Sequence, residues 1–140
     1  MTRMWTRRMA CWGLVTLLGL GAAGCSRGPS ADDPPVPAVP TDWKVISDQI
    51  ADRNKVYELE SKLEGRVKTA RSSVYQAGNQ KVQINTVVAL NTTEADKIFR
   101  ILANKKPVYG YVRKGDVLFE FVAGADAEDQ VKRGHEVLQK

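Results

Sequence analysis

Few side chains in this chain of 140 residues belong to the types that do chemistry. His135 is the sole histidine, and Cys11 and Cys25 are the two cysteines. Ser72 and Ser73 fall on a different predicted element from His135, so the spacing does not predict a nucleophile beside its base. The sequence holds no Gly-x-Ser-x-Gly, glycine-rich phosphate loop, His-Glu-x-x-His or Cys-x-x-Cys motif. We therefore expect no catalytic residue, no metal site and no cofactor, with a small hydrolase that uses two unmarked carboxylates as an open alternative.

Tyr109 and Tyr111 are the strongest binding candidates, together with Arg113. The three occupy alternate positions of a predicted strand, and alternate side chains of a strand project from one face. Flat aromatic rings stack on sugars or on packed peptide, and the arginine adds a positive charge. We expect these residues to form a binding surface. The alternative is that the first helix half covers the tyrosines, which then serve packing.

Two clusters of charge have simpler explanations. Asp126, Glu128 and Asp129 stand where the last predicted helix begins, and acids there offset the helix dipole. Their spacing lacks the alternating ligands and the glycine of a calcium loop. A basic cluster could meet phosphate or an anionic glycan, or could be solvated at a helix end and a turn. It consists of Lys105, Lys106, Arg113 and Lys114.

Hydrophobic periodicity and turn residues predict the elements that position these side chains. Gly78-Asn79 suits a tight hairpin turn, and Asn91 with Glu94 suits a helix-capping box. The expected elements are a helix from Ser47 or Asp48 to Gly65, strands over 66–76 and 80–90, a helix over 92–106 that Pro107 ends, strands over 108–113 and 116–122, and a helix from Asp126.

This order predicts an α+β domain with a four-stranded sheet, helices mainly on one face, and the sequence α-β-β-α-β-β-α. The strand over 80–90, the helix over 92–106 and the strand over 108–113 form a candidate βαβ unit, whose crossover should be right-handed. In the last hairpin, a two-residue turn at Lys114-Gly115 would place Val112 opposite Val117, and Gly110 opposite Phe119.

The N-terminal region predicts export. Residues 9–26 carry no charge and follow three arginines, which is typical of a signal peptide. Ala23-Gly24-Cys25 resembles the lipobox of bacterial lipoproteins. The resemblance implies removal of residues 1–24 and diacylation of the Cys25 sulfur, which attaches the protein to a membrane on the non-cytoplasmic side of the cell envelope. In a Gram-negative host, Ser26 after the cysteine implies the outer membrane, facing the periplasm. The alternative is an ordinary secretory signal that leaves Cys25 as a free thiol.

Residues 25–41 are expected to be a lipidated cysteine and a proline-rich tether, and residues 42–140 a single domain. Five of the six prolines lie in the tether, which at about 3.1 Å per residue would reach roughly 50 Å. The alternative is a proline-rich ligand for an envelope partner. A mature chain from Cys25 has no second cysteine, so no disulfide is expected within it.

Charge argues against nucleic acid as a partner. The whole chain has a formal charge of +5, but Arg3, Arg7 and Arg8 belong to the leader, and without them the charge falls to +2. Nucleic-acid binding favours a clustered basic face instead of a nearly neutral domain.

The order βαββα over residues 80–139 is similar to that of sporulation-related repeat (SPOR) domains, and Val82-Gln83 matches the Val-Gln of that family's first strand. The resemblance implies a periplasmic module that binds the glycan strands of peptidoglycan. Our main expectation is a non-enzymatic envelope lipoprotein that binds an envelope protein or peptidoglycan, with the SPOR-like module and the small hydrolase as alternatives.

Overall fold

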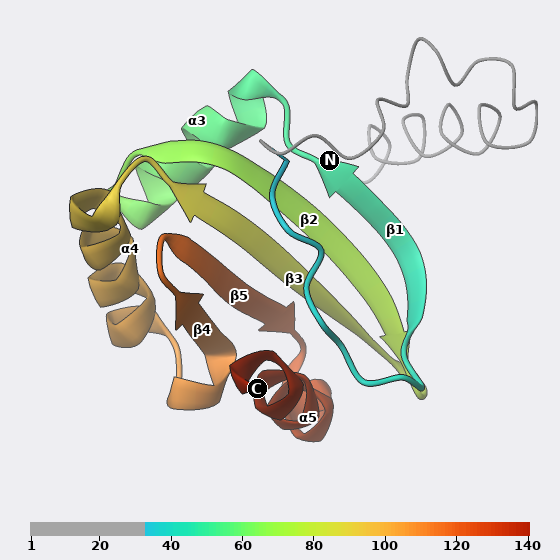
Figure 1. The fold of residues 1–140 in the computed structure, drawn as a ribbon. Helices are drawn as coiled ribbons and strands as arrows, with labels where there is room; N and C mark the ends of the chain where they lie inside the picture. The colour runs from blue at the N-terminus through green and yellow to red at the C-terminus, as the bar shows by residue number, and fades with distance from the viewer. Residues whose placement is uncertain (1–32) are drawn as a thin grey trace, which may run out of the picture. The chain divides into compact units, whose positions relative to one another are not determined.

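The computed structural model describes residues 33–140 as an α+β fold (Figure 1). This part of the chain forms one five-stranded antiparallel sheet of order β1-β2-β3-β5-β4 and three α-helices. The elements in chain order are β1 (Lys44–Ile50), α3 (Arg53–Leu63), β2 (Val67–Ala77), β3 (Gln80–Ala89), α4 (Thr92–Lys105), the 3-10 turn η1 (Val108–Gly110), β4 (Tyr111–Lys114), β5 (Val117–Ala123), the 3-10 turn η2 (Ala125–Ala127) and α5 (Glu128–Gln139). The predicted class is confirmed, whereas the predicted four strands and their order are wrong.

The additional strand is β1, which occupies residues predicted to begin the first helix. It pairs antiparallel with β2 at the edge of the sheet. The helix begins later, because Asp52 and not Ser47 or Asp48 is its N-cap: the Asp52 carboxylate accepts a hydrogen bond from the Lys55 N–H at 2.9 Å. Branched residues such as Val45 and Ile46 favour extended backbone over a helix.

The central hairpin and α4 form as predicted. β2 and β3 pair antiparallel, with Ala77 opposite Gln80 and Gly78 at a φ of 63° in the turn. The Asn91 side chain accepts from the Glu94 N–H at 2.9 Å and caps α4. Glu94 does not complete the capping box. Its carboxylate instead accepts from the Arg66 N–H at 3.1 Å, which ties α4 to the start of β2.

This contact makes the stability of the fold depend on pH. The Arg66 N–H, followed by the Lys97 ammonium, holds the pKa of Glu94 below its ordinary value of 4.5. A lowered carboxyl pKa adds stability above the ordinary value, and that stability is lost as the pH falls through the lowered pKa. We expect Glu94→Gln to lower the thermal unfolding midpoint at neutral pH, and the difference from the parent to shrink as the pH falls below the ordinary value of 4.5. Glu136→Gln, at an exposed position of α5, is the control. A constant difference across this range would contradict the assignment.

The last hairpin differs from its predicted register. β4 begins only at Tyr111, because Val108–Gly110 form the 3-10 turn η1. Val112 pairs with Phe119 instead of Val117, and Gly110 has no strand partner. The shift is two residues, so the side chains of Tyr111–Lys114 keep their predicted faces. β3 and β4 run parallel as predicted for a βαβ unit, but β5 lies between them.

Helices cover both faces of the sheet, which corrects the prediction of one face. Along β3, Val82 and Ile84 point to one face and Val87 and Ala89 to the other. The first set packs in a core with α5, here called the α5 core: Trp43, Tyr75, Ala77, Val82, Ile84, Val112, Phe119, Phe121, Ala127, Val131 and Leu138. The second set packs with α3 and α4, in the α3–α4 core: Leu63, Val67, Ala70, Val87, Ala89, Ala95, Ile98, Leu102 and Leu118. Val87 and Ala89 are the buried residues that the one-faced prediction left out.

The folded unit begins at Asp33, ahead of the domain boundary predicted at residue 42. Residues 33–43 cross the sheet in front of β2 and β3 (Figure 1). Pro34, Pro37 and Pro40 are buried, and the Pro34 carbonyl accepts from Arg71 Nε at 3.0 Å. Trp43 Nε1 donates to the Gln130 side chain of α5 at 3.1 Å. This part of the predicted tether is therefore packed on the domain, while residues 25–32 lie outside the described residues. Among the helices of residues 33–140, none combines the length and the apolar composition of a membrane span.

Candidate functional site

Tyr111 and Arg113 lie together, but they pack against α4. The Tyr111 ring meets the Phe99 ring edge-on, with centroids 5.5 Å apart. The Arg113 guanidinium lies 5.8 Å from the centre of the same Phe99 ring and forms an ion pair with Asp96 at 2.5 Å. Both side chains are half-buried and contact α4. They are therefore packed against the helix and do not form an open surface on which a sugar ring could stack.

Tyr109 is on the opposite side of the sheet, so the prediction that the three residues share one face is wrong. It belongs to η1 and packs against the α5 core, whereas Tyr111 packs against the α3–α4 core. The Lys132 ammonium lies 5.0 Å from its ring centre. Desolvation raises the pKa of Tyr109, and its hydrogen bond with Glu128 acts in the same direction.

The other predicted groups also have structural explanations. His135 is buried on α5, and no residue of the described part hydrogen-bonds its Nδ1. Lys106 donates to the Phe121 carbonyl at 2.8 Å, and Lys105 to the Lys62 carbonyl at 3.3 Å. Glu128 pairs with Lys132 at 3.0 Å, and that contact lowers the Glu128 pKa. Within residues 33–140, no group of three or more His, Cys, Asp or Glu is placed to hold a metal ion. Cys25 lies outside the described residues.

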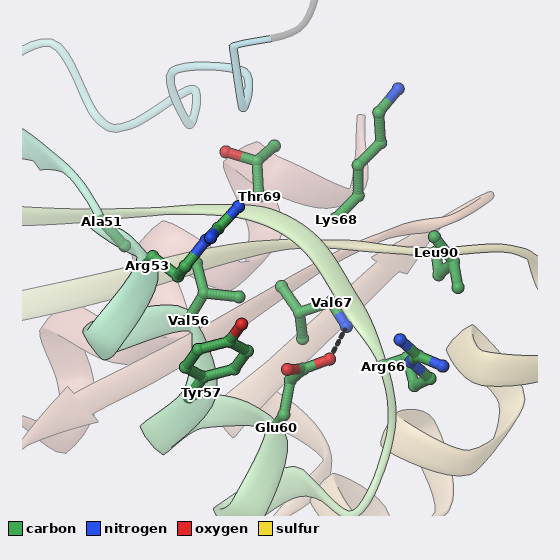
Figure 2. A pocket seen from close by; sticks show the side chains of 10 residues that line it. All are labelled: Ala51, Arg53, Val56, Tyr57, Glu60, Arg66, Val67, Lys68, Thr69 and Leu90. Atoms are coloured by element: carbon green, nitrogen blue, oxygen red, sulfur yellow. Dashed lines mark hydrogen bonds between the residues drawn. The ribbon is translucent and has the colours of Figure 1, made fainter.

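A pocket that the sequence did not predict lies between α3 and the start of β2, with a cavity volume of about 310 Å³ (Figure 2). We call it the basic pocket. Five positions on its wall are apolar or aromatic: Ala51, Val56, Tyr57, Val67 and Leu90. The volume falls at the lower end of the range for small-molecule sites, which typically combine an apolar wall with a few polar groups.

Three cations and one acid line the basic pocket. The cations are Arg53, Arg66 and Lys68, and the acid is Glu60. The Glu60 carboxylate accepts from the Val67 N–H at 2.9 Å, so part of its hydrogen-bonding capacity is used within the wall (Figure 2). Figure 2 shows the Arg53 side chain extending across the pocket toward Thr69, while Lys68 points away from it. The Arg53 guanidinium makes no hydrogen bond or ion pair within residues 33–140.

This arrangement suits an anionic group attached to an apolar or flat body. Arginine binds phosphate and carboxylate through two parallel N–H groups, and its own charge does not titrate at ordinary pH. The exposed Tyr57 ring and Leu90 side chain, at 57% and 49% exposure, can cover the apolar part of such a ligand.

Sequence reasoning missed the basic pocket because its cations come from separate elements. Arg53 begins α3, whereas Arg66 and Lys68 lie at the start of β2. The predicted helix from Ser47 or Asp48 placed Arg53 in a helix interior, away from any strand end. Only the pairing of β1 with β2, which brings Ala51 within hydrogen-bond distance of Ala70, closes this end of the fold.

Comparisons with protein-family models, with curated proteins and with solved structures find no match to this chain.

Proposed function

We propose that this chain is a non-enzymatic cell-envelope lipoprotein, anchored through diacylated Cys25, whose folded unit binds an anionic ligand in the basic pocket. The composition of the pocket wall is the observation that supports an anionic ligand. Three cations and one acid line the pocket, and that acid already accepts a backbone N–H. The leader of residues 1–24 and the Ala23-Gly24-Cys25 sequence support the anchor.

The anchor is tested by growth with an alkyne-tagged palmitate, followed by labelling of the purified protein. We expect the parent to carry the label, and Cys25→Ala to lose it and to leave the membrane fraction. Cys11→Ala is the matched control, because Cys11 lies in the leader that the proposal removes. Full labelling of Cys25→Ala would contradict the proposal.

Peptidoglycan is a second candidate ligand, favoured by a row of polar side chains on one sheet face. Gln83 donates to Asn85 at 2.9 Å, and Asn85 donates to Glu120 at 3.0 Å, across β3 and β5. Amides and carboxylates in a row can exchange these hydrogen bonds for sugar hydroxyls. If this face binds glycan, Asn85→Ala should reduce retention of the protein on purified sacculi, and Arg53→Gln should leave it unchanged.

A further inference from the structure

The basic pocket lies at the end of the sheet where the chain enters the folded unit. Arg71 holds the Pro34 carbonyl at 3.0 Å and stands opposite Ile50, the last residue of β1. The next residue, Ala51, lines the pocket, as does Thr69 two positions before Arg71. The entry point of the chain and the pocket therefore share one end of β1 and β2.

A short stretch of chain joins this end to the proposed anchor. Eight residue steps separate Cys25 from Asp33, and a fully extended chain covers at most about 3.6 Å per step, or roughly 29 Å. This is well below the roughly 50 Å expected for a tether that ran to residue 41. If Cys25 carries lipid, the pocket end stays within reach of the bilayer surface. The inference thus rests on the lipid anchor of the proposed function.

The side chains at this end have the chemistry of a membrane interface. Arg53, Arg66 and Lys68 supply positive charge, which anionic headgroups attract. Two of the apolar side chains that remain exposed line the pocket itself, Tyr57 and Leu90. Tyrosine is enriched at the headgroup level of membranes, because its apolar ring contacts lipid while its hydroxyl stays hydrated.

We infer that the basic pocket takes the phosphate of an anionic phospholipid from the same membrane that holds the lipid anchor. Arg53 and Arg66 bind the phosphate, and Tyr57 and Leu90 lie among the headgroups beside it. The anchor raises the effective concentration of headgroups at the pocket, which adds to the affinity that the site has on its own. The folded unit then lies with its pocket end on the bilayer, and the exposed face of α5 remains available to other partners.

The test uses the mature chain from residue 25 with Cys25→Ser, which keeps the tether and folded unit but cannot be acylated. Its flotation is measured with vesicles of phosphatidylcholine alone and of phosphatidylcholine mixed with phosphatidylglycerol. We expect binding only to the mixed vesicles, weakening as salt screens the charges. Arg53→Gln with Arg66→Gln should weaken that binding about 30-fold, from the loss of two cations near an anionic surface.

Lys44→Gln with Lys81→Gln is the matched control. It removes the same charge from exposed positions at the opposite end of the β1–β2–β3 ladder, where Gln76 pairs with both residues. We expect it to bind within about two-fold of the parent. Equal loss in both double variants would overturn the pocket, because it would show attraction by net charge alone.

Two further outcomes would overturn the inference. The first is equal binding to phosphatidylcholine alone, or binding to neither vesicle. The second is capture of soluble glycerol phosphate by the pocket without any preference for mixed vesicles, which would assign the pocket to a free phosphate ester. Palmitate labelling at Cys25 tests the anchor separately. A wrong assignment of the anchor is therefore distinguishable from a wrong assignment of the lipid-binding pocket.

Discussion

The Gly134→Val substitution is expected to lower the free energy of unfolding by about 2–3 kcal/mol. Gly134 lies in α5 at a position where two aromatic rings pack directly against the helix. A Cβ at this position would stand 2.7 Å from Trp43 Cη2 and 2.9 Å from Phe121 Cε1. Both rings belong to the α5 core, and Trp43 also fixes residues 33–43 to that helix. The clash therefore separates α5 from the sheet or displaces the N-terminal segment.

Urea denaturation of the mature protein measures this effect. Helix propensity alone predicts the opposite sign, because valine is a better helix former than glycine. Glu136→Val, at an exposed position of the same helix, should change stability by no more than about 0.5 kcal/mol. An equally stable or more stable Gly134→Val protein would show that α5 does not pack here as described.

The Arg71→Met substitution is expected to cost about 1–3 kcal/mol. The Arg71 side chain is 11% exposed and forms an ion pair with Asp48, whose side chain is 33% exposed. It also donates to the Pro34 carbonyl, and Ser73 Oγ donates to the same Asp48 carboxylate at 2.9 Å. Methionine fills the space but leaves the Asp48 carboxylate without its ion-pair partner and the Pro34 carbonyl without its side-chain donor.

Denaturation of a double-mutant cycle checks the origin of this cost. Adding Asp48→Asn to Arg71→Met removes the unpaired charge, so the double variant should lose less stability than the two single variants added together. Protease cleavage near Pro34 should also accelerate in Arg71→Met, since the carbonyl has lost its donor. Strict additivity with unchanged cleavage would contradict the role of Arg71 in holding the N-terminal segment.

Local signals in the sequence were sufficient for the central hairpin and for α4. A glycine with positive φ in the turn and an asparagine at the helix start act within a few residues, so no distant contact is needed to read them. β1 could not be read in this way. Its branched residues do not alternate cleanly, and a bulge between Val45 and Ser47 breaks its pattern.

Long-range packing decided the features that the sequence did not reveal. Tyr109 and Tyr111 occupy alternate positions, yet Tyr109 belongs to η1 and Tyr111 begins β4, so their rings pack against different cores. The sequence did not predict that the second face of β3 is buried, because Gln83 and Asn85 make one half of that face polar. The basic pocket depends on which strand ends meet, and strand order is a property of the whole sheet.

An acylated Cys25 at the start of the mature protein would set the distance between the basic pocket and the membrane, so the N-terminus of the mature protein is the property to measure. Mass spectrometry of the N-terminal peptide of protein purified from the membrane fraction measures this directly. We expect a peptide that begins at Cys25 and carries two or three acyl chains. A peptide that begins at Met1, or that holds Cys25 as a free thiol, would contradict it.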